Sequence, residues 1–329
     1  MGPGNGRTVA RPHRVLHRRF RPRPAPPPGP GPLRSSGLYP GEPEACRRNL
    51  RPFLHNLAYL ALLLAVFRVY RIEERAYQGH AFQMLATLAF LTLPLHYLAP
   101  FRWKKPLFIA ISIAGLLGVG GAWVAALALA IAAALIGVCY LPVSWTARAA
   151  TCAAIAAALA LARPRATAAG IPETVWPIVA SMFMFRMILY LYELKHVRGP
   201  EPLADTLGYF FVLPNYGFLH FPVVDYRTMQ RGYFAADVHA IQRRGLTMML
   251  RGTVHLLGYR LVYNELLIPA ADVHDPAGLA RYLVCNYLLY LQVSGQFHMA
   301  CGMLHLFGFQ LPATHHHYLL ATSFTDYWR

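Results

Sequence analysis

Long apolar runs recur along this chain from residue 52 onward, separated by short polar or glycine- and proline-containing segments. The first two runs cover residues 52–70 and 80–100, and each is close to the roughly 20 residues that a helix needs to cross the hydrocarbon of a membrane. Residues 106–140 are apolar throughout but too long for one span. The glycine-rich stretch 115–121 predicts a break there between two shorter helices.

Four later runs continue this pattern. Residues 146–162 are alanine-rich, whereas residues 174–196 form a strong apolar run with Arg186 near its middle. Two more runs cover residues 246–268 and 279–307. Together, the runs predict an all-α fold, a polytopic transmembrane helical bundle of about eight spans.

The segment between the middle and the last runs has a different pattern. Residues 209–226 are aromatic, but Pro214, Gly217 and Pro222 prevent a straight helix. Because irregular backbone is tolerated at membrane depth only where protein covers it or a cavity holds water, we expect a re-entrant or interfacial element here. Residues 227–244 are basic and mixed, which is typical of an interfacial helix.

Composition favours a membrane protein and bears on its partners. Of 329 residues, 56% are hydrophobic and only 14% are charged, against roughly 45–50% and 25% in a soluble domain. The formal net charge is +17, and eleven arginines precede Pro52. A basic chain can bind nucleic acid, but no recognised nucleic-acid module accompanies this charge. We therefore expect the cations to flank spans and meet anionic lipid, with no nucleic acid as a partner.

Three regions follow from these patterns. Residues 1–50 are rich in Arg, Pro and Gly, and such a segment buries too little apolar surface to fold. We expect a disordered cytoplasmic tail there, and a mis-assigned upstream start codon is the alternative. Residues 51–170 form an N-terminal transmembrane scaffold, and residues 171–329 hold the candidate chemistry.

The charges of the loops orient the predicted spans. A cytoplasmic N-terminus places the basic loops on the cytoplasmic side, as the positive-inside rule requires. The loop with Asp272 and Asp275 contains no Lys or Arg and then falls outside. The basic positions placed inside are Arg102, Lys104, Lys105, Lys195, Arg198 and the segment 227–244.

Ionisable side chains inside apolar runs are costly and usually face the bundle interior or a wet cavity. Here they concentrate in the second half of the chain, which predicts that the first half is scaffold and that the second half surrounds a polar site. For any single residue, snorkelling or a hydrogen bond between helices is the alternative. The residues are Arg186, Arg251, His255, Arg260, His298 and His305.

The last apolar run contains the densest group of polar side chains. Helical periodicity places Ser294 and His298 on one face, with His305 a further seven residues along that face. Gly295 and Gly302 permit the close approach of a neighbouring helix. This run is either one wall of a polar tunnel or a tightly packed span with internal hydrogen bonds.

Other chemistries have no recognisable motif. The five cysteines are scattered without a Cys-x-x-Cys pair, so we expect neither a disulfide framework nor a zinc site. The three consecutive histidines at 315–317 point in different directions on a helix, and we expect no metal site there. No Gly-x-Ser-x-Gly elbow and no phosphate-binding glycine loop is present.

The stretches "SGQFHMACGMLHLFGFQLP" (294–312) and "YLLATSFTDYWR" (318–329) resemble the heart of the membrane-bound O-acyltransferases. The similarity is greatest to the bacterial branch that includes alginate O-acetylation and teichoic-acid D-alanylation proteins, and it extends over about residues 174–329. His298 stands where that branch usually has an acidic residue, and Tyr327 replaces a Phe. The matching residues are Ser294, Gly295, Gly308, Phe309, Leu311, Pro312, Tyr318, Leu319, Ser323, Asp326, Trp328 and Arg329.

The resemblance implies an acyl transfer across the membrane. An acyl group, acetyl being the leading candidate, passes from coenzyme A or another thioester carrier to a hydroxyl of a polysaccharide or lipid, with no bound cofactor. The family's general-base histidine and its Trp-His motif lie beyond Arg329, so the resemblance implies an incomplete core and no catalytic residue in this chain. It makes Ser294, His298, His305, Asp326, Trp328 and Arg329 tunnel-lining candidates.

The resemblance also implies partners and a location. The partners are the lipid bilayer, the acyl donor, the acceptor and an accessory acyltransferase protein, and the location is the bacterial inner membrane. Two other functional classes stay open. One is a non-catalytic membrane partner that keeps the scaffold without the chemistry, and the other is a transporter, although no internal repeat is detectable.

Overall fold

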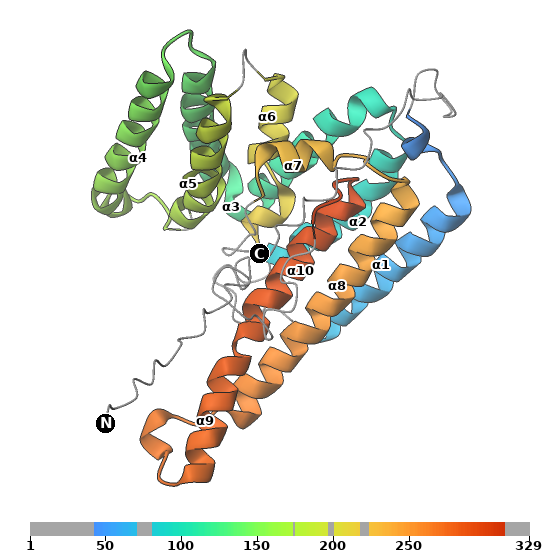
Figure 1. The fold of residues 1–329 in the computed structure, drawn as a ribbon, viewed down its shortest axis with the longest axis vertical. Helices are drawn as coiled ribbons and strands as arrows, with labels where there is room; N and C mark the ends of the chain where they lie inside the picture. Colours follow the sequence, from blue (N-terminus) through green and yellow to red (C-terminus); the bar gives the residue numbers. More distant parts are fainter. Residues whose placement is uncertain (1–42, 71–80, 174, 197–200, 218–223, 313–329) are drawn as a thin grey trace, which may run out of the picture. The chain divides into compact units, whose positions relative to one another are not determined.

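The computed structural model describes residues 43–70, 81–173, 175–196, 201–217 and 224–312, and for 181–184 only the backbone. The described residues are helical almost throughout and form no strand beyond one isolated antiparallel bridge between Tyr233 and Phe309. Figure 1 labels the longer helices. They are α1 (Leu50–Tyr70), α2 (Ala81–Leu98), α3 (Phe101–Tyr140), α4 (Trp145–Ala168), α5 (Val175–Leu194), α6 (Leu203–Phe210), α7 (Tyr226–Arg231), α8 (Val238–Leu261), α9 (Pro276–Leu288) and α10 (Tyr290–Leu306).

Five of these helices, α1 to α5, are long and apolar enough to cross a membrane. The prediction of an all-helical protein with several such helices is therefore confirmed, and the figure of about eight spans stays a prediction. The two last predicted spans are interrupted. The run 246–268 leaves α8 for a single π-helical turn at Val262–Leu266, and the run 279–307 is divided between α9 and α10 at Leu289.

Helix α3 bends sharply at Gly121, where φ is +75° and ψ is 172°. A glycine adopts this left-handed φ without the steric cost that a side chain would bring. Lys105 forms an ion pair with Asp205, and the Tyr140 hydroxyl donates to the Thr206 Oγ1 at 2.8 Å. In a straight helix Lys105 and Tyr140, which lie near the two ends of α3, would be about 50 Å apart. Both ends of α3 therefore reach neighbouring residues of α6, and the predicted break within 115–121 is confirmed at its last residue.

The proline-interrupted segment lies in the core. Helix α6 ends at Phe210, and a 3₁₀ turn at Leu213–Tyr216 packs against α2, α3, α5 and α10. Every residue from 209 to 216 is buried. Protein covers the described part of this irregular backbone, the re-entrant or interfacial element stays a prediction, and residues 218–223 lie outside the described residues.

Arg186 is the only arginine that the described residues bury almost completely, and it stabilises this irregular segment. Its Nη1 donates to the carbonyl oxygen of Tyr209 at 2.7 Å, and its guanidinium carbon lies 5.6 Å from the centre of the Tyr209 ring. A cation thus satisfies a carbonyl at the end of α6, where intrahelical partners run out. Burial raises the pKa of the nearby Tyr216 hydroxyl, which keeps the phenol neutral.

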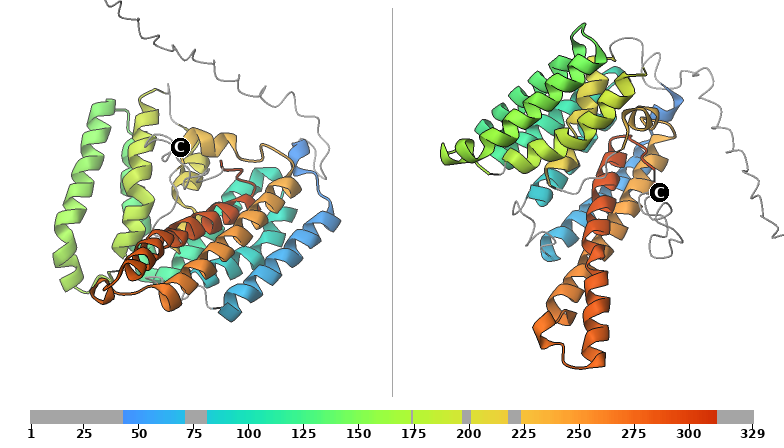
Figure 2. Two further views of the ribbon diagram at one scale, coloured as in Figure 1. Left: turned by 60° about the horizontal axis from the view of Figure 1, so that its bottom comes forward. Right: turned by 60° about the vertical axis from the view of Figure 1, so that its left-hand side comes forward.

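Helices α8 and α10 form the closest helix pair among the described elements, and α1 packs along the other side of α8. Figure 2 shows α8 and α10 side by side along most of their length. Aspartates begin three helices by accepting a hydrogen bond from a backbone N–H: Asp225 for α7, Asp237 for α8 and Asp275 for α9. The predicted scaffold (51–170) and the region that follows it contact each other, since α1 packs on α8 and α3 packs on α5 and α6.

Candidate functional site

Two pairs of glycines bring α8 and α10 into backbone contact. A Cβ added to Gly252 would lie 2.8 Å from the carbonyl oxygen of Gly295, and one added to Gly245 would lie 2.7 Å from that of Gly302. The members of each helix's pair are seven residues apart, so both pairs lie on one seam of two antiparallel helices. The predicted close approach at Gly295 and Gly302 is confirmed.

Three polar side chains meet along this seam. The Ser294 hydroxyl lies 3.1 Å from Nδ1 of His255, and the ring centres of His255 and His298 are 5.3 Å apart. Nδ1 of His298 is 2.7 Å from the carbonyl oxygen of Ser294, one turn earlier. Because a carbonyl only accepts, Nδ1 of His298 carries the proton and Nε2 presents its lone pair. His255 and His298 are partly exposed, whereas Ser294 is fully buried.

This arrangement brings a hydroxyl and an imidazole within hydrogen-bond reach, which is also the geometry of a nucleophile and its base. The Ser294 hydroxyl is buried and already has a partner in Nδ1 of His255, so it offers an acyl donor no unpaired nucleophile. The pair therefore links two helices and orients His255, and the accessible proton acceptors of the cluster are the two histidines. The alternative of a packed span with internal hydrogen bonds describes Ser294 well.

His305 lies two turns further along α10 and is completely buried. Its Nδ1 is 2.8 Å from the carbonyl oxygen of Cys301, so Nε2 is again the acceptor. Within the described part of the chain, no donor reaches this Nε2 atom. A buried acceptor without a donor is costly unless a ligand or further chain supplies one.

A second polar group joins α8 and α10 to the first half of the chain. Nδ2 of Asn56 donates to Oε1 of Gln242 at 3.4 Å, and Nε2 of Gln242 donates to the carbonyl oxygen of Leu306 at 3.3 Å. The Tyr97 hydroxyl lies 3.4 Å from Nε2 of His239. Helices α1, α2, α8 and α10 thus share one chain of buried polar contacts beside His305.

Lys104 contributes a buried cation next to this group. Its ammonium donates to the carbonyl oxygens of His96 and Tyr97, at 2.7 and 2.9 Å, and its exposed fraction is 3%. These carbonyls belong to the last turn of α2, where intrahelical donors are lacking. The His96 ring packs edge-on against Phe307, with centres 5.1 Å apart. The interpretation of the first half as scaffold, made from its scarcity of ionisable residues, did not single out Asn56, His96 and Lys104.

Backbone hydrogen bonds join the loop after α10 to the segment before α8. The backbone N–H of Phe234 donates to the carbonyl oxygen of Gly308 at 2.8 Å, and that of Gln310 donates to Gly232 at 2.9 Å. Gly308 has a φ of +89°, and a Cβ there would lie 2.4 Å from the Phe234 ring. This position therefore requires glycine, and it falls in the Gly-Phe-Gln-Leu-Pro stretch of the resemblance.

The predicted site residues divide into two groups. Ser294, His298 and His305 all lie on α10, with Ser294 and His298 in contact and His305 in a separate, more deeply buried position. Asp326, Trp328 and Arg329 lie outside the described residues, as do the histidines at 315–317. Among residues 43–312 with their gaps, no group of three or more His, Cys, Asp or Glu is placed to hold a metal ion.

The sequence pattern did contain a signal for one missed residue. Asn56, His96 and Lys104 interrupt or border apolar runs, and Lys104 was assigned to a cytoplasmic loop from its charge alone. Lys104 follows the end of the second apolar run by a few residues, and a lysine near a helix C-terminus can donate to the last carbonyls of that helix. The count of basic residues in loops does not consider this role.

Comparison with known proteins found no matching family model, no matching curated protein and no matching solved structure.

Proposed function

We propose that this chain is part of a membrane-bound O-acyltransferase that moves an acyl group, with acetyl as the leading candidate, from a thioester to a hydroxyl. The observation that carries the proposal is the position of His305. Its Nε2 is a buried acceptor without a donor among the described residues, three residues before the family-like stretch 308–312. A substrate hydroxyl donating to this atom would satisfy it.

The proposed reaction assigns separate roles to residues inside and beyond the chain. The hydroxyl oxygen attacks the thioester carbonyl, the carbon–sulfur bond breaks, and the thiol leaves with the proton that a general base took from the hydroxyl. The proposal places this base beyond Arg329. His305 positions the acceptor, and the His255–His298 pair lines its approach. Asp326, Trp328 and Arg329 complete the lining in the proposal.

The proposal includes partners and a membrane. The N-terminus faces the cytoplasm of a bacterial inner membrane, the acyl donor arrives from that side, and the acceptor is a polysaccharide or lipid. An accessory acyltransferase protein is a further proposed partner. The five apolar helices and the high apolar content support the membrane setting.

The test is transfer of label from radioactive acetyl-CoA in membranes that contain either this chain or a version extended along its natural reading frame. We expect transfer by the extended chain, and a three- to tenfold loss in its His305→Phe variant, because one hydrogen bond to the acceptor is removed. His55→Phe is the matched control. His55 makes the same contact with the carbonyl four residues earlier, at 2.8 Å, but is exposed on α1.

Two results would count against the proposal. Equal losses in the His305→Phe and His55→Phe variants would remove His305 from the acceptor site. No transfer by the extended chain with either acetyl-CoA or a longer acyl-CoA would favour the non-catalytic membrane partner. That second function has its own support, because the Ser294 hydroxyl, which lies beside Nδ1 of His255 on α8, is buried and already paired with that ring.

A further inference from the structure

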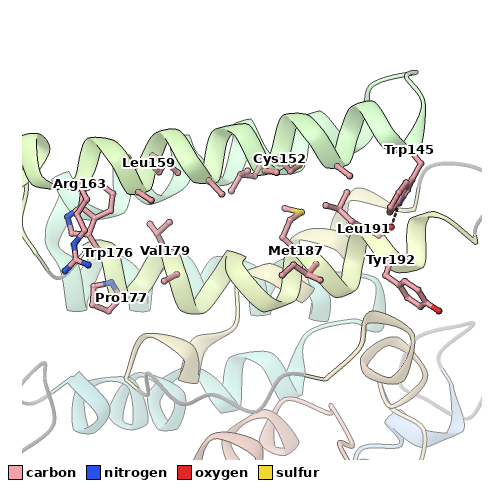
Figure 3. A pocket seen from close by; sticks show the side chains of 17 residues that line it. Trp145, Cys152, Leu159, Arg163, Trp176, Pro177, Val179, Met187, Leu191 and Tyr192 are labelled. Atoms are coloured by element: carbon pink, nitrogen blue, oxygen red, sulfur yellow. Dashed lines mark hydrogen bonds between the residues drawn. The ribbon is translucent and has the colours of Figure 1, made fainter.

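A long apolar groove runs between α4 and α5, away from the polar groups of α8 and α10 (Figure 3). Its volume is about 830 Å³. Alanines of α4 form one wall, and Val179, Met187 and Leu191 of α5 form the other. No acidic side chain lines the groove. A space of this size between two helices stays empty only at a high cost in lost contacts, so something fills it in the native protein.

Helix α4 shows how little of this surface the described protein covers. Cys152 is the only residue of α4 that is buried, although its 24 residues are mostly alanine and leucine. A helix of this length and hydropathy is long enough to cross hydrocarbon, and in water it would expose a large apolar surface. The groove therefore opens toward lipid, and hydrocarbon is the simplest occupant.

The two ends of the groove carry the residues that mark membrane interfaces. Trp145 and Tyr192 lie at one end, and Trp176 lies at the other beside Arg163 (Figure 3). The indole of Trp145 donates to the carbonyl oxygen of Leu191 at 2.6 Å. From Trp145 to Arg163 the helix rises about 27 Å, close to the roughly 30 Å of a hydrocarbon core. Tryptophan and tyrosine concentrate at such interfaces.

Arg163 is the charged residue among those that line the groove, whereas Lys195 at the other end lies 5.1 Å from the centre of the Trp145 ring without lining the groove. Arg163 is exposed, and it makes no hydrogen bond or ion pair with any described residue. Arg165 follows it on the last turn of α4, and α4 contains no acidic residue. An anionic headgroup at this end would neutralise Arg163 while its chain lies along the apolar walls, since basic positions between membrane helices bind such headgroups.

We propose that the groove between α4 and α5 binds one anionic phospholipid, with an acyl chain between the helices and its phosphate at Arg163. This site is independent of the acyl-transfer proposal, because it uses none of the residues of α8 or α10. It would fix α4, which has few protein contacts of its own, against the rest of the bundle.

The test compares the protein in nanodiscs of phosphatidylglycerol and of phosphatidylcholine. After transfer to mild detergent, native mass spectrometry counts the retained lipids, and thermal unfolding reports stabilisation. We expect retention of phosphatidylglycerol in preference to phosphatidylcholine. Inorganic phosphate alone should not stabilise the protein, because it has no chain to fill the groove.

Two variants separate headgroup from chain. Arg163→Gln should reduce the preference for phosphatidylglycerol about fivefold, whereas Arg68→Gln, an exposed arginine in the last turn of α1, should leave it unchanged. Ala156→Phe places a ring in the groove and should abolish retention of either lipid. Ala157→Phe is its control, because Ala157 is exposed on the same helix but does not line the groove.

Three outcomes would overturn the proposal. Equal retention by the Arg163→Gln and Arg68→Gln variants would remove the headgroup contact. Equal losses in the Ala156→Phe and Ala157→Phe variants would remove the groove as the site. Stabilisation by phosphate alone, or a groove closed by the helix of a second protein with no lipid retained, would assign a different occupant.

Discussion

Gly245 of α8 and Gly302 of α10 meet backbone to backbone. A Cβ on Gly245 would lie 2.7 Å from the Gly302 carbonyl oxygen, and a Cβ on Gly302 would lie 2.6 Å from the Gly245 carbonyl oxygen. Neither neighbour is the flexible end of a side chain, so a methyl group at either position forces the helices apart.

Gly245→Ala and Gly302→Ala should each destabilise the protein by about 1–3 kcal/mol, because each inserts a methyl group against backbone. Equilibrium unfolding in mixed micelles would measure the change. Gly137→Ala in α3 is the control, since a Cβ there meets nothing within 4 Å. That variant should be more stable by about 0.5–1 kcal/mol, because alanine restricts the unfolded chain. Stability losses of equal size at Gly245, Gly302 and Gly137 would contradict the close backbone contact between α8 and α10.

Ser294 and His255 should be energetically coupled. A double-mutant cycle with Ser294→Ala and His255→Phe should give an interaction free energy of about 0.5–1.5 kcal/mol, because the 3.1 Å contact joins two helices. The same cycle with Thr247→Ala in place of Ser294→Ala should give a value near zero. Thr247 donates only to the carbonyl of Arg243 on its own helix. A Ser294 coupling no larger than that of Thr247 would rule out the link.

Lys104 should be important for stability despite its position beside a short loop. Lys104→Met leaves two carbonyls of α2 without their donor and should reduce the free energy of unfolding by about 1–3 kcal/mol. Arg102→Gln changes an exposed cation on the same turn and should alter it by less than about 0.5 kcal/mol. Thermal unfolding of both variants in one detergent provides the comparison, and equal effects would mean that only charge matters.

Gly308 and Gly170 have almost the same left-handed φ, +89° and +91°, in different surroundings. Gly170→Ala should cost about 1–2 kcal/mol from backbone strain alone. Gly308→Ala adds a collision with the Phe234 ring and should cost about 2–5 kcal/mol. The difference between their free energies of unfolding isolates the packing of the loop against Phe234. A second change, Phe234→Leu, should recover part of the loss at Gly308.

The pattern of the sequence predicted features that depend on one residue type at one place. Gly121 allows a conformation closed to other residues, so a glycine-rich stretch inside an apolar run predicted the bend in α3. Gly295 and Gly302 predicted close helix contact for the same reason. The heptad between them also occurs in α8, as Gly245 and Gly252, but sequence spacing does not show which helix is the partner.

Features that depend on distant partners could not be predicted in this way. The charge of Lys104 predicts a cytoplasmic side, which stays a prediction. It does not show that the ammonium donates to two carbonyls of α2, because only the packing of α2 on α3 brings them near. Asn56 and Gln242 are 186 positions apart in the sequence. Ser294 was expected on a polar face, and the face is correct, but burial of its hydroxyl follows from α8 covering it. The roles of Asp326, Trp328 and Arg329 remain predictions from the resemblance.

The bend at Gly121 has a consequence for how the chain is assembled during synthesis. Because Asp205 and Thr206 hold the two ends of α3, neither end has its partner until translation has passed α6. Helices α1 to α5, which are long and apolar enough to cross a membrane, are therefore synthesised before the contact that closes α3 exists, and chains fold from the N-terminus as they emerge. In a nascent chain stalled on the ribosome between α5 and α6, the two ends of α3 would lack their α6 partners. Resumed translation through α6 would supply Asp205 and Thr206 and bring the two ends together.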